Sequence, residues 1–439
     1  MSDKSLFQLS YPLLLSALVG MIVMLLDMVI ISAYSENAAA AVSIANQILL
    51  VAFDFSAILA TGAVVLIPRF LGAKEDTNAR FTTQTGIIAS GMVSLMLGVI
   101  VLVAAPMLIK AINCPAEILG DATTYLRVGS LTIVFNGVMM MSTAVLRGYG
   151  ETLLVFLLGV FAYALYLICE YVFIFGLWII PELGVLGSAL ATLLVRVTAV
   201  VALLVVLAKR LRAFEDLKQF DFKSASQRAK EMFHLSWPGA VDNLGYGFYQ
   251  MILVSFIAAQ SVAMLLARTF TLSLTAMLTV VLMSISQGNE VMVGYRVGAG
   301  REDQINRCVI QASIASTVLT MSLAVLFYLF SDTLLRLFTT QREVLELGRS
   351  LLGITVFVQP FSAVNTILFH SLKARGDVRV PVLATQLMMW FLSVPLAYWL
   401  AVVIDHGVIG LWYVLLFEEA LKAGFLFLRW KVLGYEGTV

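Results

Sequence analysis

Long apolar stretches, each about the length of a membrane-spanning helix, alternate with short polar segments along the whole chain. A helix needs roughly 20 mostly apolar residues to cross the hydrocarbon core of a bilayer. By this measure the sequence predicts twelve spans, at about 7–33, 39–66, 83–108, 118–145, 152–177, 184–208, 235–259, 262–293, 306–330, 344–371, 380–403 and 407–430. No segment alternates polar and apolar residues as a membrane β-strand does, so we expect an all-α integral membrane protein.

The composition supports this interpretation. Hydrophobic residues fill 61% of the 439 positions and charged residues only 13%, against about 25% charged residues in soluble domains. Lys and Arg (28) nearly balance Asp and Glu (27), so no bulk charge indicates a nucleic-acid partner. The three cysteines lie far apart and predict neither a disulfide framework nor a metal site. The polar start runs directly into an apolar stretch too long for a signal-peptide core, which we interpret as the first span.

Lys and Arg lie almost entirely in alternate loops, and loops rich in these residues face the cytoplasm. If the N-terminus is cytoplasmic, the opposite loops hold only Lys110, Arg336 and Arg342. We therefore expect both termini in the cytoplasm and the protein in the cytoplasmic (inner) membrane. The longest polar stretch, near 209–230, is strongly basic and is interpreted as a solvated linker that anchors this topology.

The two halves of the chain share landmarks at one constant spacing. Ser-Tyr-Pro at 10–12 matches Ser-Trp-Pro at 236–238, Gly-Ala at 72–73 matches Gly-Ala at 298–299, and Gly-Glu at 150–151 matches Gly-Asp at 376–377. Six spans separate the copies, which predicts two parallel six-helix lobes related by a pseudo-twofold axis along the membrane normal. The expected domains are an N-terminal lobe at 1–208, a cytoplasmic linker at 209–232 and a C-terminal lobe at 233–439. Repeats of this kind are typical of transporters that bind substrate between their halves.

The chain has no phosphate-binding Gly-x-x-x-x-Gly-Lys-[Ser/Thr] motif, and its three histidines are isolated. Transport is therefore expected to be passive or coupled to an ion gradient, with no enzymatic activity and no cofactor. A coupled carrier needs ionisable groups inside the membrane, where a charge is costly enough to indicate function.

Asp27 in the first span and Glu170 in the fifth reach a similar depth in the outer half of the membrane. Ser188 and Thr192 in the sixth span reach the same layer and share one helix face. These four residues are the predicted cation-coupling site, because oxygen ligands suit sodium and a shielded carboxylate can equally hold a proton.

The repeat supports a special role for the two acids, since Leu253 and Leu396 stand at their positions in the second half. The alternative is that Asp27 and Glu170 only pair with a buried arginine or a backbone donor. For the hydroxyls of the sixth span, helix packing is the favoured interpretation.

Other polar side chains inside the spans are candidates to line a substrate cavity. They are Asp54 in the second span, Asp242, Asn243, Tyr246 and Gln250 in the seventh, and Arg268 in the eighth. For Arg268, and for Arg127 and Arg196, ion pairing between helices is the favoured interpretation. Glu418 and Lys422 are expected to compensate each other as an i, i+4 pair.

Several short motifs recur in order along both halves. They are Pro12 and Pro238, Ala-Thr-Gly at 60–62 with Arg-Phe-Leu-Gly-Ala-Lys at 69–74, Leu-Arg-Gly-Tyr-Gly-Glu-Thr at 146–152, Val-Gly-Tyr-Arg-Val-Gly-Ala-Gly at 293–300, and Ala-Arg-Gly-Asp at 374–377. With these motifs the chain resembles the multidrug and toxic compound extrusion (MATE) family over its whole length. The resemblance implies twelve spans in two parallel lobes and export of organic, often cationic, compounds in exchange for sodium ions or protons.

The resemblance also implies a cation site in the first lobe. The family's aspartate in the first span matches Asp27, and its small or hydroxyl residues in the sixth match Ser188 and Thr192. The family's Asn-x-x-x-Asp in the fifth span is changed here, with Glu170 as the acid and Tyr166 in place of the asparagine. This change removes a neutral oxygen ligand, and the coupling ion stays open between a proton and a sodium ion held by the two acids.

We therefore expect a secondary active exporter that expels small organic compounds, cations among them, in exchange for protons or sodium ions. Its expected partners are the organic substrate and membrane lipid, with no nucleic acid, and it is expected to be a monomer. The alternative is a flippase for lipid-linked or amphipathic anionic precursors on a related two-lobe architecture. Arginines that line a cavity would favour the alternative, whereas arginines paired between helices would not.

Overall fold

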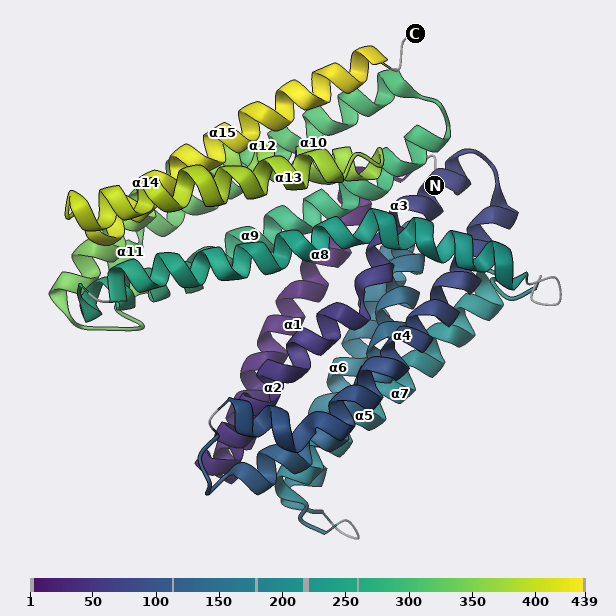
Figure 1. Cartoon of the computed structure of the whole chain (residues 1–439), viewed down its shortest axis with the longest axis horizontal. Helices are drawn as coiled ribbons and strands as arrows, with labels where there is room; N and C mark the ends of the chain where they lie inside the picture. Colours follow the sequence, from purple (N-terminus) through teal and green to yellow (C-terminus); the bar gives the residue numbers. More distant parts are fainter. Residues whose placement is uncertain (1–3, 113, 178–180, 216–220, 259, 437–439) are drawn as a thin grey trace. The chain divides into compact units, whose positions relative to one another are not determined.

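The chain is helical almost throughout in a computed structural model that describes residues 4–112, 114–177, 181–215, 221–258 and 260–436 (Figure 1). The helices are α1 (Leu6–Tyr34), α2 (Glu36–Ser56), α3 (Ile58–Gly72), α4 (Asp76–Ala111), α5 (Leu119–Gly148), α6 (Thr152–Phe175), α7 (Gly184–Arg210), α8 (Phe222–Ala258), α9 (Val262–Gly298), α10 (Glu302–Leu329), α11 (Ser331–Leu335), α12 (Arg342–Ala374), α13 (Arg379–Met388), α14 (Val394–Tyr398) and α15 (Gly407–Glu436), with π-helical segments η2 (Met389–Ser393) and η3 (Trp399–Val403). The predicted all-α class is confirmed.

Ten helical segments in the described ranges are long and apolar enough to cross a membrane. The second of the twelve predicted spans consists of α2 and α3, which are interrupted at Ala57, and the eleventh runs continuously from α13 through η3. The two predicted spans outside these ten fall on α8 and α15, which have 37 and 30 residues. Both are long enough to span, but charged side chains interrupt their apolar stretches, as Glu418, Glu419 and Lys422 do in α15.

The repeated landmarks correspond to repeated backbone turns. Gly150 after α5 and Gly376 after α12 both take a positive φ, 77° and 83°, and Lys74 and Gly300 after α3 and α9 take 62° and 66°. The two members of each pair stand at the same constant spacing as the sequence landmarks. A left-handed residue favours glycine because it has no Cβ, which explains why three of the four positions are glycine.

The described chain divides into two compact units. One contains Lys4 and Leu15–Trp237, and the other contains Ser5–Leu14 and the chain from Pro238 onward. This division falls inside α8, which itself begins at Phe222, within the predicted linker. The predicted domain boundaries at 208–209 and 232–233 stay a prediction.

In the first unit, α5 packs against α2, α3, α4 and α7, while α6 packs along α7; Figure 1 shows α4 to α7 running side by side. In the second unit, α12 packs against α9, α10 and α15. Each unit contains two clusters of buried apolar side chains. Each unit therefore has its own packed core.

A close approach between α6 and α7 positions the polar residues of the first unit. A Cβ added to Gly187 of α7 would lie 2.3 Å from the backbone oxygen of Phe173 in α6. Only glycine allows the two backbones to come this near. The approach brings Ser188, the next residue, against the side chain of Glu170.

Candidate functional site

Asp27 and Glu170 meet in one polar site inside the first unit. The hydroxyl of Tyr166 on α6 donates a hydrogen bond to Oδ1 of Asp27 on α1, over 2.5 Å. Tyr166 and Glu170 are one helical turn apart and share a face of α6, and Glu170 interacts electrostatically with Asp27. The structure therefore brings together the two acids that the sequence placed at one depth.

Glu170 is fully buried, with 0% of its surface exposed. The Ser188 hydroxyl donates to its Oε1 over 3.3 Å. Its other oxygen, Oε2, has no hydrogen-bond partner among the described residues. A buried ionised carboxylate with an unpaired oxygen is unfavourable, and a proton or cation at Oε2 would relieve that cost.

The two predicted hydroxyl residues of α7 take different roles. Ser188 contacts Glu170 directly, as described above. Thr192 donates instead to the backbone oxygen of Ser188, over 3.1 Å. Such a bond to the residue four positions earlier is usual for threonine inside a helix. Thr192 therefore contributes no hydrogen bond to either acid in this structure.

Tyr125 of α5 is a member of this site that the sequence analysis missed. It is buried, donates to Oδ1 of Asn46 on α2 over 3.3 Å, and interacts electrostatically with Asp27 and Glu170. The argument from membrane depth that identified Ser188 applies to Tyr125 as well. Tyr125 lies in the first turns of a span that enters the membrane from the same side as α7.

Arg196 of α7 contacts neutral groups of neighbouring helices. Its guanidinium donates to Oδ1 of Asn136 on α5 and lies 4.1 Å from the ring centroid of Phe53 on α2. Asn136 in turn donates to Oγ of Ser56, over 2.7 Å. Arg127 has an exposed side chain. Among the described residues neither arginine forms an ion pair with a carboxylate.

Of the six predicted cavity residues, one lies in the first unit and five lie in the second unit. Asp54 lies in the first unit with an exposed side chain, and Asn243 in the second unit is also exposed. Arg268 of α9 donates to Oε1 of Gln250 over 2.6 Å, and Gln250 donates to the hydroxyl of Tyr246 over 2.6 Å. Arg268, Gln250 and Tyr246 therefore form a hydrogen-bonded chain between α8 and α9.

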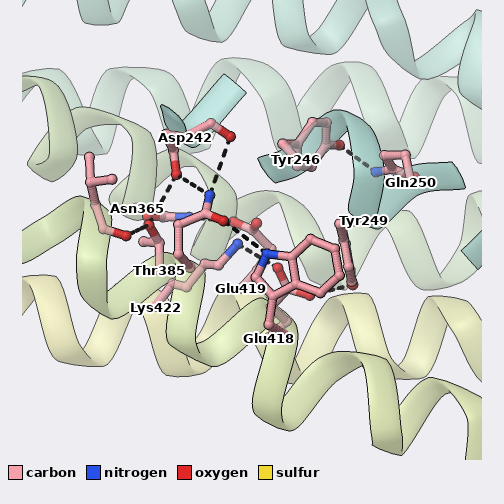
Figure 2. A network of polar contacts seen from close by, with 12 residues as sticks. Asp242, Tyr246, Tyr249, Gln250, Asn365, Thr385, Glu418, Glu419 and Lys422 are labelled. Carbon is pink, nitrogen blue, oxygen red and sulfur yellow. Dashed lines mark hydrogen bonds and ion pairs between the residues drawn. The ribbon is translucent and has the colours of Figure 1, made fainter. Parts of the chain in front are cut away.

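Asp242 joins a different set of contacts in the second unit (Figure 2). Its Oδ1 accepts from the side-chain amide of Gln386 over 2.8 Å and from the hydroxyl of Thr385 over 3.3 Å. Gln386 also accepts from the indole nitrogen of Trp390 over 3.0 Å. These contacts connect α8 to α13 and η2.

Glu418 and Lys422 of α15 form the predicted i, i+4 ion pair, which is confirmed. Two neighbours of this pair were not anticipated. The hydroxyl of Tyr249 donates to the other oxygen of Glu418 over 2.6 Å, and the amide of Asn365 donates to Glu419 over 2.9 Å. Figure 2 shows the five side chains in one neighbourhood of the second unit.

Within the described ranges no group of three or more His, Cys, Asp or Glu side chains lies close enough to bind a metal ion. At the Asp27 site the available oxygens come from two carboxylates and from hydroxyls. Two of these hydroxyls, on Tyr166 and Ser188, donate their protons to the carboxylates.

Comparison with known proteins places these features in a family. The family model MatE matches residues 12–172 and 238–399, once in each half, and the two matches begin at the paired prolines, Pro12 and Pro238. The uncharacterized transporter YisQ of Bacillus subtilis is 28% identical over 433 residues, which cover 98% of this chain and 95% of that protein. The probable multidrug resistance protein NorM of Thermotoga maritima is 23% identical over 413 residues, covering 93% and 88%.

Solved structures have the same fold. The Vibrio cholerae MATE transporter VcmN in its bent form superposes with a TM-score of 0.89 at 19% identity, covering 98% of this chain and 97% of that one. An outward-facing multidrug resistance MATE transporter of the MOP superfamily gives 0.86 at 20% identity, covering 99% and 96%. The predicted fold of two six-helix lobes is confirmed by these likenesses.

Proposed function

Because the chain belongs to the multidrug and toxic compound extrusion (MATE) family, we propose that it is an antiporter that exports small organic compounds in exchange for protons. As a member of this family it is a multi-pass membrane transporter and not an enzyme. Relatives in Thermotoga maritima and Bacillus subtilis are named probable multidrug resistance proteins, which supports an organic cargo. The observation that supports coupling to an ion gradient is the presence of two acids, Asp27 and Glu170, in one polar site of the first unit.

The hydrogen bonds around the two acids favour the proton over sodium as the coupling ion. A hard cation needs several oxygen lone pairs directed at one point. Here the hydroxyls of Tyr166 and Ser188 donate to Asp27 and Glu170, so their protons occupy the space between the oxygens. The remaining unpaired oxygen, Oε2 of Glu170, is sufficient for one proton.

In the proposed cycle a proton from outside binds at Glu170 and is released to the cytoplasm, with both termini on the cytoplasmic side. Protonation removes a buried charge, which changes the relative free energies of the conformations of the first unit. A conformation that is favoured by the neutral site then releases the organic cargo outside.

Cationic cargo is favoured by the charges of the second unit. Asp242 supplies a carboxylate beside Gln386 and Trp390 on α13 and η2. Arg196 and Arg268 donate to amides on neighbouring helices, an arrangement that does not require an anionic partner. These contacts support a drug-type exporter over the alternative, a flippase for anionic precursors.

The test uses the whole protein in proteoliposomes with a fluorescent organic cation. A proton gradient and a sodium gradient are imposed separately, and Asp27→Asn and Glu170→Gln are compared with wild type. We expect export driven by the proton gradient alone and its loss in both variants. Glu36→Gln, an exposed acid at the start of α2, is the matched control and should transport normally. Sodium-driven export with no response to pH would contradict the assignment of the ion.

A further inference from the structure

Arg196 brings a positive charge close to the two acids of the first unit. It follows Ser188 and Thr192 on α7 at intervals of four residues, so the three side chains share one helix face. Eight residues correspond to about 12 Å along the helix axis. The guanidinium itself is placed by its contacts with Asn136 of α5 and Phe53 of α2.

The guanidinium is anchored by groups that do not neutralise it. Its partners are the amide of Asn136 and the ring of Phe53, and among the described residues no carboxylate forms an ion pair with it. Asn136 is 2% exposed and is itself fixed by its hydrogen bond to Ser56. The arginine is therefore held in place with its charge uncompensated by its direct contacts.

The ionisable groups around Arg196 connect it to the acids. Those facing it are Tyr125 of α5 and Tyr163 and Tyr166 of α6, with Asp27 of α1 and Glu170 of α6 beyond Tyr166, while Asp54 of α2 and Arg127 of α5 are exposed. Tyr166 is the shared member, since it interacts with Arg196 and donates to Asp27. Tyr166 thus connects the surroundings of Arg196 to the Asp27 carboxylate.

The repeat shows that the fold does not require a cation at this place. Gly-Val-Leu-Gly at 184–187 matches Gly-Val-Ile-Gly at 407–410, at a spacing slightly shorter than that of the other landmarks. At this local spacing the counterpart of Arg196 on α15 is Glu419, a residue of opposite charge. The arginine is therefore specific to the half that contains the coupling acids.

We propose that Arg196 is a built-in counter-charge that limits the first unit to one proton per transport cycle and sets the pH at which the site loads. With both acids ionised, Asp27, Glu170 and Arg196 together have one net negative charge, and one proton makes the set neutral. Without the arginine, two protons are needed for neutrality, and a net charge inside the membrane is costly. The inference rests on the proposed proton antiport, and it makes Arg196 a positioning residue that never contacts the cargo.

The experiment compares Arg196→Gln and Arg196→Lys with wild type in proteoliposomes. The number of protons per exported monovalent cation is obtained from the effect of membrane potential on export, because exchange of one proton for one cation is electroneutral whereas exchange of two protons moves net charge. We expect one proton for wild type and Arg196→Lys, and two for Arg196→Gln. Loss of a positive charge roughly 10 Å away should also move the pH of half-maximal export upward by about one unit.

A second variant tests the charge without removing the arginine. Asn136→Asp places a carboxylate against the guanidinium, so we expect the same upward shift and the same change in proton number. If Arg196→Gln does not fold, Asn136→Asp still tests whether the charge of Arg196 sets the proton number and the pH response. An unchanged proton number and pH response in both variants would overturn the inference, as would Arg196→Lys behaving like Arg196→Gln. Absence of proton-driven export in wild type would instead overturn the proposed antiport, so the two failures are distinguishable.

Discussion

The hydroxyl of Tyr166 donates to Oδ1 of Asp27 over 2.5 Å and connects α6 to α1 at the coupling site. In the family pattern an asparagine stands at this position. Its side-chain oxygen offers a lone pair to a cation and donates no proton. Here a proton lies between the two oxygens. The tyrosine therefore changes the site from one that offers lone pairs to one that supplies a hydrogen bond to its carboxylate.

Replacing Tyr166 is expected to change which ion drives transport. Tyr166→Phe removes a hydrogen bond to a charged group, which contributes about 1.5–3 kcal/mol, and should lower proton-driven export about tenfold or more. Tyr166→Asn supplies an oxygen acceptor beside Asp27 and should permit export driven by a sodium gradient. Both are measured as dye flux in proteoliposomes with the two gradients varied separately. Tyr171→Phe, an exposed tyrosine on the same helix, should leave flux unchanged, and proton-only export by Tyr166→Asn would contradict the proposed role.

Glu170→Gln is expected to abolish gradient-driven transport without lowering the stability of the protein. The amide can still accept from Ser188, but it cannot take up a proton, so gradient-driven export should fall to background. Since glutamine has nearly the shape of the acid but no charge to bury, we expect thermal stability at least equal to that of wild type. Thermal unfolding of purified protein and dye flux are measured on the same sample. A variant that unfolds at a much lower temperature would show that Glu170 is instead a structural residue.

Gly187→Ala is expected to disturb the coupling site by forcing the backbones of α6 and α7 apart. The added methyl would lie 2.3 Å from the Phe173 oxygen, so α6 and α7 would have to separate. Overpacking of this kind costs about 1–3 kcal/mol and would move Ser188 away from Glu170. Gly159→Ala on α6 is the matched control, because nothing lies within 4 Å of its added Cβ. Equal melting temperatures for the two variants would show that the helices adjust without cost.

The helices and the repeat could be predicted from the sequence because the length of a span and the glycines of a turn are local properties. Gly150 and Gly376 stand at the repeat spacing, and both take a left-handed conformation. The depth argument also placed Asp27 beside Glu170. The break at Ala57 between α2 and α3 was not predicted, since neither proline nor glycine marks it.

Individual contacts inside the site could not be predicted, because they depend on how each helix rotates about its axis. Apolar residues cover all sides of a helix in lipid, so hydrophobicity contains little information about rotation. Tyr166 was interpreted only as a missing ligand, although it donates to Asp27. Arg196 was expected to pair with an acid, but its partner is the amide of Asn136.

The start of α8 is expected to loosen at acidic pH. Asp221 accepts hydrogen bonds from the hydroxyl and backbone nitrogen of Ser224 and from the backbone nitrogen of Lys223, which lower the pKa of its carboxyl. A group with a lowered pKa stabilises the fold above its ordinary pKa, and that contribution is lost as the pH falls through the lowered value. Hydrogen exchange of the Ser224 amide should therefore lose protection below about pH 4. Asp221→Asn keeps a capping oxygen that does not titrate, so its protection should not change with pH.

Lys422 is expected to be more important for the stability of the second unit than any exposed lysine. It is 6% exposed and pairs with Glu418, which is 2% exposed. Lys422→Met would leave that carboxylate buried with only the Tyr249 hydroxyl as a partner, at a cost of about 3–5 kcal/mol. The double variant Glu418→Gln, Lys422→Met removes both charges and should recover most of the lost stability in thermal unfolding. Arg342→Met breaks an exposed pair of the same spacing, with Glu346, and should have no measurable effect. A double variant no more stable than Lys422→Met alone would show that the lysine acts through packing and not through its charge.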